Sequence, residues 1–459
     1  MSAATTAYLP SARDLRDVAS LALPIVAIQI GLIAMGTVDS IMVGRVSAEA
    51  LAAVALANLY SFGFTSFGLG ALLALDPVIS QAIGARDEKA VARGLQRGLL
   101  LAFALAIPIA LALLAVEPAL ALMRQPPELI PIAGGYVYRI VSGVFPFLAF
   151  VVLRQTLQAH RQTRAVLLTI LLANAANVVL NYAWIYGNFG FPALGALGSA
   201  WSTLVCRWLM AALLLALGWP YVAAHLRRPA ARVFAAAPMR RMLRIGLPIG
   251  AQVFLEWAMF GTVGFLMGAF GTIQVAAHQI AINLSSLTFM VPVGISSAAA
   301  VIVGQAVGRG DASGVRRSSG AALLVGVGFM SAAAVLFVGA PAALAGIYTQ
   351  EPGVLGLAIV LLPIAGVFQI FDGAQAVALG VLRGMGDTRG PVVIAIVGFW
   401  LCGMPVSLWL AYVEGLGPRG LWWGLVAGLA AVAVFLLARI RQRLRRAIAR
   451  IEIDEPHVP

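Results

Sequence analysis

Long apolar runs recur along the whole chain, and they restrict the folds open to it more than any other feature. A helix needs about 20 consecutive apolar residues to cross the hydrocarbon core of a bilayer. Of the 459 residues, 61% are hydrophobic and only 11% are charged, so a soluble fold could not bury the apolar surface. We therefore expect an all-α integral membrane protein with about twelve transmembrane helices. The expected spans are residues 20–44, 54–83, 98–122, 132–154, 165–187, 195–218, 243–268, 279–304, 319–346, 354–381, 391–413 and 420–440.

The charge of the chain is strongly basic, with a formal net value of +13. In a soluble protein this would suggest nucleic acid as a partner, but no aromatic–basic interleave or nucleic-acid motif accompanies it. Most basic residues fall in alternate loops between the expected spans, as is typical of loops that remain in the cytoplasm. We therefore expect no nucleic-acid partner, a position in the plasma or inner membrane, and both termini in the cytoplasm. Residues 1–20 lack the features of a cleavable signal.

The two halves of the sequence resemble each other. LALPIVAIQ from Leu21 corresponds to IGLPIGAQV from Ile245, and ISQAIGARD from Ile79 corresponds to VGQAVGRGD from Val303. The pairs GTVDSIMVG with GTVGFLMGA and LQAHRQTRA with LRGMGDTRG keep the same offset of 224–225 residues. Six-span halves that begin on the same side are parallel repeats, a build found in transporters. The predicted organisation is a cytoplasmic segment 1–19, a lobe 20–218, a cytoplasmic loop 219–242, a lobe 243–440 and a basic tail 441–459.

Four acidic residues fall inside the expected spans: Asp39, Asp76, Glu256 and Asp372. An acid at the centre of a membrane helix costs about 2.5–3.5 kcal/mol on insertion scales, so it must face protein or a water-filled cavity. One interpretation is structural, with each acid protonated and hydrogen-bonded to a neighbouring helix; Asp76, which precedes Pro77, could also serve a kink. The functional interpretation is that these acids exchange a proton or a sodium ion for a cationic substrate.

Uncharged polar residues accompany the acids in the expected spans. Asn177 and Asn181 are four residues apart and share one helix face, and Thr203 follows in the next span. The two amides could coordinate an ion or simply bridge helices. Further polar residues mark the start of the eighth span: His278, Gln279 and Asn283. For His278, a helix-bridging role and a role as proton relay both remain open.

Several long motifs occur in a fixed order along the chain. The first half contains TVDSIMVGR, VISQAIGARD and LNYAWIYGNFGFPALGALGSAWST, and the second contains GLPIGAQVFLEWAMF, AAHQIAINLSSLTFMVPVGISSAAAVIVGQAVGRGD and FQIFDGAQAVALGVLRGMGDTRG. On these residues the chain resembles the multidrug and toxic compound extrusion (MATE) family, most closely its NorM-like branch, over nearly all of residues 20–440. The resemblance implies two pseudo-symmetric six-helix bundles and an antiporter that exports organic cations by alternating access.

The resemblance also implies roles for individual residues. Glu256 and Asp372 match the cation site of the C-terminal lobe, where Na⁺ is a possible ligand. Asp76 looks more like an acidic position of eukaryotic relatives, and His278 is one of the possible accessory residues, with Gln279 and Asn283. No cofactor is implied besides a coupling ion, Na⁺ or H⁺. The implied partners are small organic cations and the lipid bilayer, and a monomer is expected.

In the N-terminal lobe, Asp39 matches the acid of the family's second site. Its polar neighbours there match Asn177, Asn181 and Thr203. Some branches of the family carry an acid at the position of Asn181. Because this chain has an amide there, Asp39 is expected to be the main titratable group of the N-terminal site.

Other function classes compete with a cation exporter. A non-transporting receptor or membrane scaffold would not need a pair of six-helix repeats with isolated acids. A flippase for lipid-linked oligosaccharides, from a related transporter family, should line its cavity with basic residues, whereas Arg207 is the basic residue well inside a span. A membrane enzyme is disfavoured because the sequence contains neither a phosphate-binding glycine loop nor an HExxH or nucleophile-elbow motif. Cys206 and Cys402 are far apart in apolar runs and are interpreted as packing residues.

Overall fold

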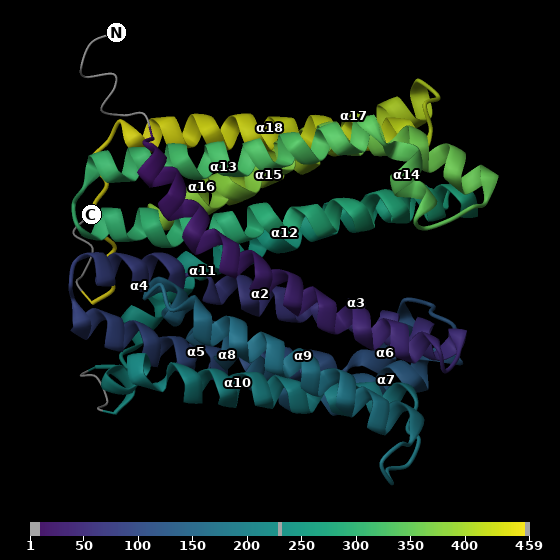
Figure 1. Cartoon of the computed structure of the whole chain (residues 1–459), viewed down its shortest axis with the longest axis horizontal. Helices are drawn as coiled ribbons and strands as arrows, with labels where there is room; N and C mark the ends of the chain where they lie inside the picture. The colour runs from purple at the N-terminus through teal and green to yellow at the C-terminus, as the bar shows by residue number, and fades with distance from the viewer. Residues whose placement is uncertain (1–9, 228–231, 455–459) are drawn as a thin grey trace. The chain divides into compact units, whose positions relative to one another are not determined.

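The computed structural model describes residues 10–227 and 232–454, shown as coloured ribbons in Figure 1. Parts of the predicted segment 1–19, loop 219–242 and tail 441–459 lie outside the described residues. Within the described ranges, 12 helices are long and apolar enough to span a membrane, which confirms the predicted all-helical membrane fold. Their bounds are Ala12–Gly44, Ala48–Gly84, Glu88–Leu114, Leu129–Ala159, Thr163–Tyr186, Ala196–Leu226, Ala236–Gly268, Thr272–Gly308, Ala312–Gly339, Pro352–Gly384, Arg389–Val413 and Pro418–Leu444.

Nine of these spans are single helices. They are α2 (Ala12–Gly44), α5 (Glu88–Leu114), α9 (Thr163–Tyr186), α10 (Ala196–Leu226), α11 (Ala236–Gly268), α12 (Thr272–Gly308), α13 (Ala312–Gly339), α15 (Pro352–Gly384) and α18 (Pro418–Leu444). The short helices α6 (Val116–Leu122) and α14 (Pro341–Gly346) are connectors. Several helices extend beyond the expected apolar spans, because hydropathy marks the bilayer rather than the point where backbone hydrogen bonding ends.

The remaining spans are interrupted. The second span breaks between α3 (Ala48–Leu72) and α4 (Leu75–Gly84), where Pro77 in the first turn of α4 lacks a backbone N–H. The fourth span joins α7 (Leu129–Ile140) to α8 (Val144–Ala159) through the 3₁₀ turn η1 (Val141–Gly143). The eleventh span consists of α16 (Arg389–Ala395), the π-helical segments η2 (Ile396–Gly403) and η3 (Trp409–Val413), and α17 (Met404–Leu408) between them.

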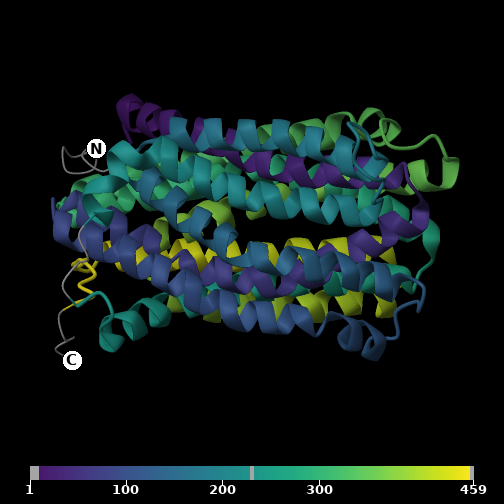
Figure 2. The same ribbon diagram turned by 90° about the horizontal axis from the view of Figure 1, so that it is seen from below.

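The chain divides into two compact units by its internal contacts. One unit comprises residues 1–26 and 251–451, and the other comprises 27–250 and 452–459. We name them the C-unit and the N-unit. In the C-unit, the long helix α15 packs on α12, α13 and α18, which Figure 1 labels. Figure 2 shows the same ribbon turned by 90°. In the N-unit, α10 packs on α5, α8 and α9, and α3 packs on α7.

Two glycine contacts bring long helices into close approach at matching positions of the repeat. A Cβ atom at Gly70 of α3 would lie 2.8 Å from the backbone nitrogen of Gly250 in α11. A Cβ atom at Gly294 of α12 would lie 2.9 Å from the backbone nitrogen of Val26 in α2. The same offset of 224 residues separates the two glycines and the two partners. The first part of α2 is therefore held by the C-unit, and the first part of α11 is held by the N-unit.

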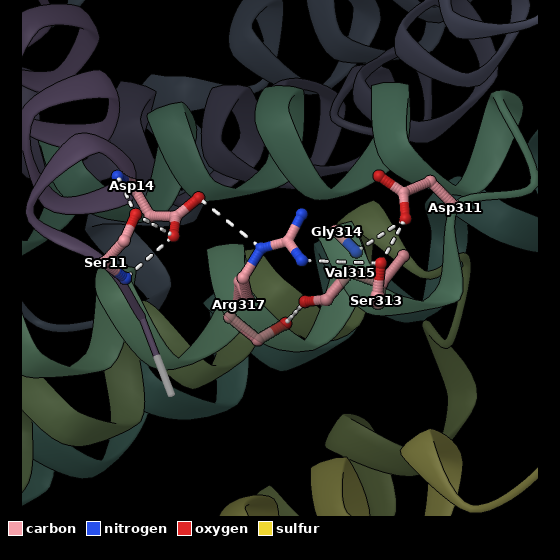
Figure 3. Close-up of polar contacts among 8 residues, drawn as sticks. Ser11, Asp14, Asp311, Ser313, Gly314, Val315 and Arg317 are labelled. Atoms are coloured by element: carbon pink, nitrogen blue, oxygen red, sulfur yellow. Dashed lines mark hydrogen bonds and ion pairs between the residues drawn. The ribbon is translucent and has the colours of Figure 1, made fainter. Parts of the chain in front are cut away.

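Polar contacts fix the beginning of α2 against α13 within the C-unit (Figure 3). The Asp14 carboxylate accepts a 2.8 Å hydrogen bond from the backbone N–H of Ser11 and lies 3.8 Å from Nε of Arg317. At the start of α13, Asp311 accepts a 2.8 Å bond from the N–H of Gly314. That bond and a second from Ser313 hold the pKa of Asp311 below its usual value. Both helix starts are thereby capped by a carboxylate, which complements the helix dipole.

The C-terminal tail ends on the N-unit. Arg97 of α5 is only 1% exposed, and its Nη2 lies 2.6 Å from Oδ1 of Asp454. Nε of Arg93 lies 2.5 Å from the other carboxylate oxygen, and Arg241 donates a 2.6 Å hydrogen bond to the carbonyl of Ile453. The buried guanidinium of Arg97 thus receives its counter-charge from the end of the described chain.

Candidate functional site

A buried acid lies at the centre of a polar cluster in the N-unit. Asp39 of α2 is 5% exposed. Its Oδ1 accepts hydrogen bonds of 2.9 Å from Nδ2 of Asn177 and 2.5 Å from Nδ2 of Asn181, and its Oδ2 accepts a 3.2 Å bond from Oγ1 of Thr203. The structure therefore brings together the four residues proposed for the N-terminal site, while their role in coupling stays a prediction.

Two of the donors to this carboxyl come from one face of α9. Asn177 and Asn181 are one turn apart on α9 and both are fully buried. Asn181 also donates a 3.3 Å bond to Oδ1 of Asn177, which orients the two amides. Oδ1 of Asn181 is buried with no hydrogen-bond partner among the described residues. The cluster therefore keeps a free oxygen acceptor beside a carboxylate, the kind of ligand that a proton-carrying water or a hard cation uses.

Sequence reasoning missed one member of this cluster. Tyr136 of α7 is 1% exposed, and its hydroxyl lies 3.4 Å from Oγ1 of Thr203. It extends the hydrogen-bonded chain from Asp39 to a fourth helix. No spacing relates Tyr136 to Asp39, because the contact depends on how α7 packs on α10.

The second carboxyl cluster lies in the C-unit, around the half-buried Glu256 of α11. Its Oε2 accepts a 2.8 Å hydrogen bond from Nε2 of Gln252, and its Oε1 accepts a 3.0 Å bond from Nε2 of Gln375 on α15. Sequence reasoning missed both glutamines. The available signal was their spacing, because Gln252 is one turn before Glu256 and Gln375 is three residues after Asp372.

Asp372 lies on α15 and is 4% exposed. It interacts electrostatically with Glu256, so the structure brings the two predicted acids of the C-terminal site into one cluster. Oδ1 of Asp372 and Oε1 of Gln375 are both buried without a hydrogen-bond partner in the described part of the chain. Buried polar atoms are normally satisfied, so these two oxygens indicate a place for an ion or an ordered water.

A third polar side chain continues this face of α15. Gln369, three residues before Asp372, accepts a 2.5 Å hydrogen bond from Oγ1 of Thr288 on α12 and is fully buried. Gln369, Asp372 and Gln375 therefore present one polar stripe inside the C-unit. In residues 10–227 and 232–454, no group of three or more His, Cys, Asp and Glu side chains gathers as a metal centre would require. An ion in this cluster would therefore be coordinated by two carboxylates together with amide or backbone oxygens.

The accessory candidates lie on α12 and at the start of α4. His278 of α12 is buried, with its ring centroid 5.6 Å from that of Trp422, and a Cβ atom at Gly264 would lie 3.7 Å from its Nε2. Gln279 and Asn283 are exposed on α12. Asp76 is buried in the first turn of α4, where a carboxylate complements the helix dipole. These positions support a packing role for His278 and a helix-start role for Asp76.

The fold and the two buried carboxyl clusters define a multi-pass membrane protein of the transporter class. The family model described as MatE matches residues 24–183 and 248–409. The chain belongs to the MatE family, and this confirms the resemblance seen in its motifs.

Curated relatives match over nearly the whole chain. A probable multidrug resistance protein NorM of Rhizobium meliloti (strain 1021) is 36% identical over 94% of this chain and 93% of its own length. The multidrug resistance protein NorM of Burkholderia vietnamiensis is 37% identical over 97% and 98%. The multidrug resistance protein MdtK of Edwardsiella ictaluri (strain 93-146) is 34% identical over 94% and 95%.

Solved structures share the fold. The eukaryotic MATE transporter AtDTX14 superposes with a TM-score of 0.85 at 21% identity, covering 95% of this chain and 98% of its own. The Vibrio cholerae MATE transporter VcmN in its bent form superposes with a TM-score of 0.83 at 19% identity, covering 94% and 97%. These matches confirm the MATE-type helical fold.

Proposed function

We propose that this protein exports lipophilic organic cations from the cytoplasm by antiport against an inward flow of sodium ions or protons. The observation that carries the proposal is the Glu256–Asp372 cluster, where a half-buried carboxyl, a buried one and an unpartnered amide oxygen gather in one unit. A carboxylate buried without a fixed cation attracts any cation that can enter, whether it is a coupling ion or a substrate.

The relatives support the substrate class, because the NorM and MdtK proteins are described as multidrug resistance proteins. The proposal places the protein in the plasma or inner membrane, with both termini in the cytoplasm, as a monomer that requires no cofactor. It performs transport without covalent chemistry. Acidic rather than basic interior clusters favour an exporter of cations over a flippase of anionic lipid-linked sugars.

Efflux from reconstituted liposomes tests this proposal. Purified protein is incorporated into vesicles, and sodium and proton gradients are imposed separately while ethidium movement is followed by fluorescence. We expect transport with one gradient and its loss in a Glu256→Gln/Asp372→Asn variant that still inserts. Equal ethidium movement by that variant, or movement that ignores both gradients, would contradict the proposal.

A further inference from the structure

A basic residue, Arg207, lies on the same face of α10 as Thr203, which contacts Asp39. Arg207 lies on α10 one turn after Thr203, so the two side chains point from the same face. Thr203 donates its hydroxyl proton to Oδ2 of Asp39 at 3.2 Å. The side chain of Arg207 therefore starts one helical turn from Thr203, the residue on α10 that binds the Asp39 carboxyl.

The arginine occupies a slot that the neighbouring segment leaves open for it. A Cβ atom at Gly143 of η1 would lie 3.0 Å from Cδ of Arg207, which is tighter than an ordinary contact. Cζ of Arg207 lies 5.3 Å from the ring centroid of Phe147 on α8, a cation–π distance. The absence of a side chain at Gly143 thus leaves space for the methylene groups of Arg207, and the guanidinium packs on the ring of Phe147.

The guanidinium is held weakly for a buried charge. Its Nη1 atom is buried and has no hydrogen-bond partner within the described ranges. A stacking contact alone leaves the donors of an arginine unsatisfied. The side chain can therefore exchange its contact with Phe147 for a bond to an oxygen acceptor without breaking an existing hydrogen bond at Nη1.

Three ionisable or charged groups interact electrostatically here from three helices: Asp39 on α2, Tyr136 on α7 and Arg207 on α10. Arg207 interacts electrostatically with both Asp39 and Tyr136. Arginine stays protonated in proteins, so this charge is permanent. The hydrogen bonds that Asp39 accepts come from neutral amides and a hydroxyl. Arg207 is therefore the positive charge that acts on this carboxylate within the N-unit.

We propose that Arg207 is a positioning and specificity-determining residue that competes with an organic cation for the Asp39 carboxylate. The inference rests on the proposed export of organic cations. An entering cation must overcome the field of the arginine, and the arginine restores a counter-charge as the cation leaves. Arg207 thereby weakens the binding of the organic cation at Asp39 and speeds its release, so the cation does not remain bound at the cluster.

Charge-removing and charge-keeping variants at one position test this proposal. In liposomes, Arg207→Gln should lower KM for ethidium about tenfold, corresponding to about 1.4 kcal/mol, and should also lower kcat because release slows. Arg207→Lys keeps the charge and should restore both values toward wild type. The matched control is Arg139→Gln, which removes a half-buried arginine of the same unit that bonds to the carbonyl of Gly135. That control should leave both KM and kcat unchanged.

Equilibrium binding separates this proposal from the transport proposal. Ethidium anisotropy with purified protein should give a lower Kd for Arg207→Gln even if coupling fails in vesicles. In an Asp39→Asn background, Arg207→Gln should have no further effect on Kd, because the carboxylate for which the arginine and the cation compete is gone. An unchanged or higher Kd, a Lys variant that behaves like the Gln variant, or the same fall in Kd without Asp39 would each overturn the inference.

Discussion

Asn177 of α9 and Asp39 of α2 are 138 positions apart in sequence, yet the amide of one donates a 2.9 Å hydrogen bond to the carboxyl of the other in the interior of the N-unit. The bond means that the carboxyl is stabilised by neutral donors rather than by a direct ion pair. A neutral cage leaves the carboxyl able to gain or lose a positive partner during a transport cycle.

Asp39→Asn should abolish the dependence of ethidium efflux on the driving gradient, because an amide cannot exchange a proton or bind a cation by charge. We expect the transport rate to fall by about tenfold or more, in keeping with a loss of at least one charge interaction. Efflux is measured in inverted vesicles at several pH values and sodium concentrations. Asp311→Asn, at the half-buried N-cap of α13, is the control and should keep wild-type coupling. A normal pH and sodium dependence in Asp39→Asn would show that this carboxyl is not a coupling site.

Glu256→Gln and Asp372→Asn should each stop export while leaving the protein in the membrane. The two carboxyls interact with each other, so removal of either should disable the shared cluster rather than halve its activity. Substrate accumulation in cells and protein amount in membranes are measured together. Glu414→Gln, at an exposed position after η3, is the control. Efflux by the double variant at the wild-type rate would refute the assignment.

Gln375→Leu should weaken cation binding at Glu256 without removing a charge. The variant loses the 3.0 Å hydrogen bond from Nε2 of Gln375 to Oε1 of Glu256. It also loses the amide oxygen of Gln375, which is buried without a partner in the described part of the chain. Loss of a residue that orients a ligand carboxylate typically costs about 10–100-fold in ion affinity. The measurement is the sodium or proton concentration that gives half-maximal transport. Gln279→Leu, on an exposed position of α12, should leave that concentration unchanged; an equal shift in both variants would point to a general effect on the C-unit.

Gly70→Val should destabilise the protein by about 1–3 kcal/mol, the usual cost of overpacking. The new side chain would meet the backbone of Gly250, which cannot move aside as a flexible side chain can. Gly294→Val should have a similar effect at Val26. Melting temperature in detergent is the readout. Gly63→Val in the same helix α3 meets nothing within 4 Å and is the matched control. If Gly70→Val and Gly63→Val have the same melting temperature, the close approach of α3 and α11 is not needed for stability.

Asp454→Asn should lower the melting temperature, because the nearly buried guanidinium of Arg97 loses its carboxylate partner. A hydrogen bond to a charged group is worth about 1.5–3 kcal/mol, and part of this remains because an amide oxygen can still accept. Glu452→Gln, an exposed acid of the same tail, is the control and should melt like wild type. The effect should be smaller when Arg97 is already replaced by Gln, because only the ion pair with Arg93 then remains to be lost.

The sequence was sufficient to predict the spans and the positions of the acids, since both follow from local properties. Apolar length marks a span whatever packs around it, and an intramembrane acid is conspicuous wherever it occurs. The spacing of Asn177 and Asn181 also showed that they share a face. The structure adds that this face meets Asp39.

The missing parts of the clusters depend on packing between helices distant in sequence. Gln252 and Gln375 are ordinary helix residues until α11 and α15 place both amides on Glu256. Tyr136 joins the Asp39 cluster only through the way α7 packs on α10. Arg207 is one turn after Thr203 on α10, and that spacing gains its meaning from the bond of Thr203 to Asp39. The interrupted eleventh span also escaped prediction, because π-helical turns leave the apolar composition of a segment unchanged.

The exchange of chain ends between the two units has a consequence for biosynthesis. Val26 packs against Gly294, and Arg97 pairs with Asp454, so the first half of the chain contains two sites that only the second half can fill. A nascent chain that has delivered its first six spans to the membrane therefore has an unpartnered opening helix and an arginine without its carboxylate. Gly294 becomes available once α12 has been made, but Asp454 becomes available only when the ribosome has finished the second half. Final maturation of the N-unit is thus post-translational, and two separately encoded halves would have to be made together to complete it.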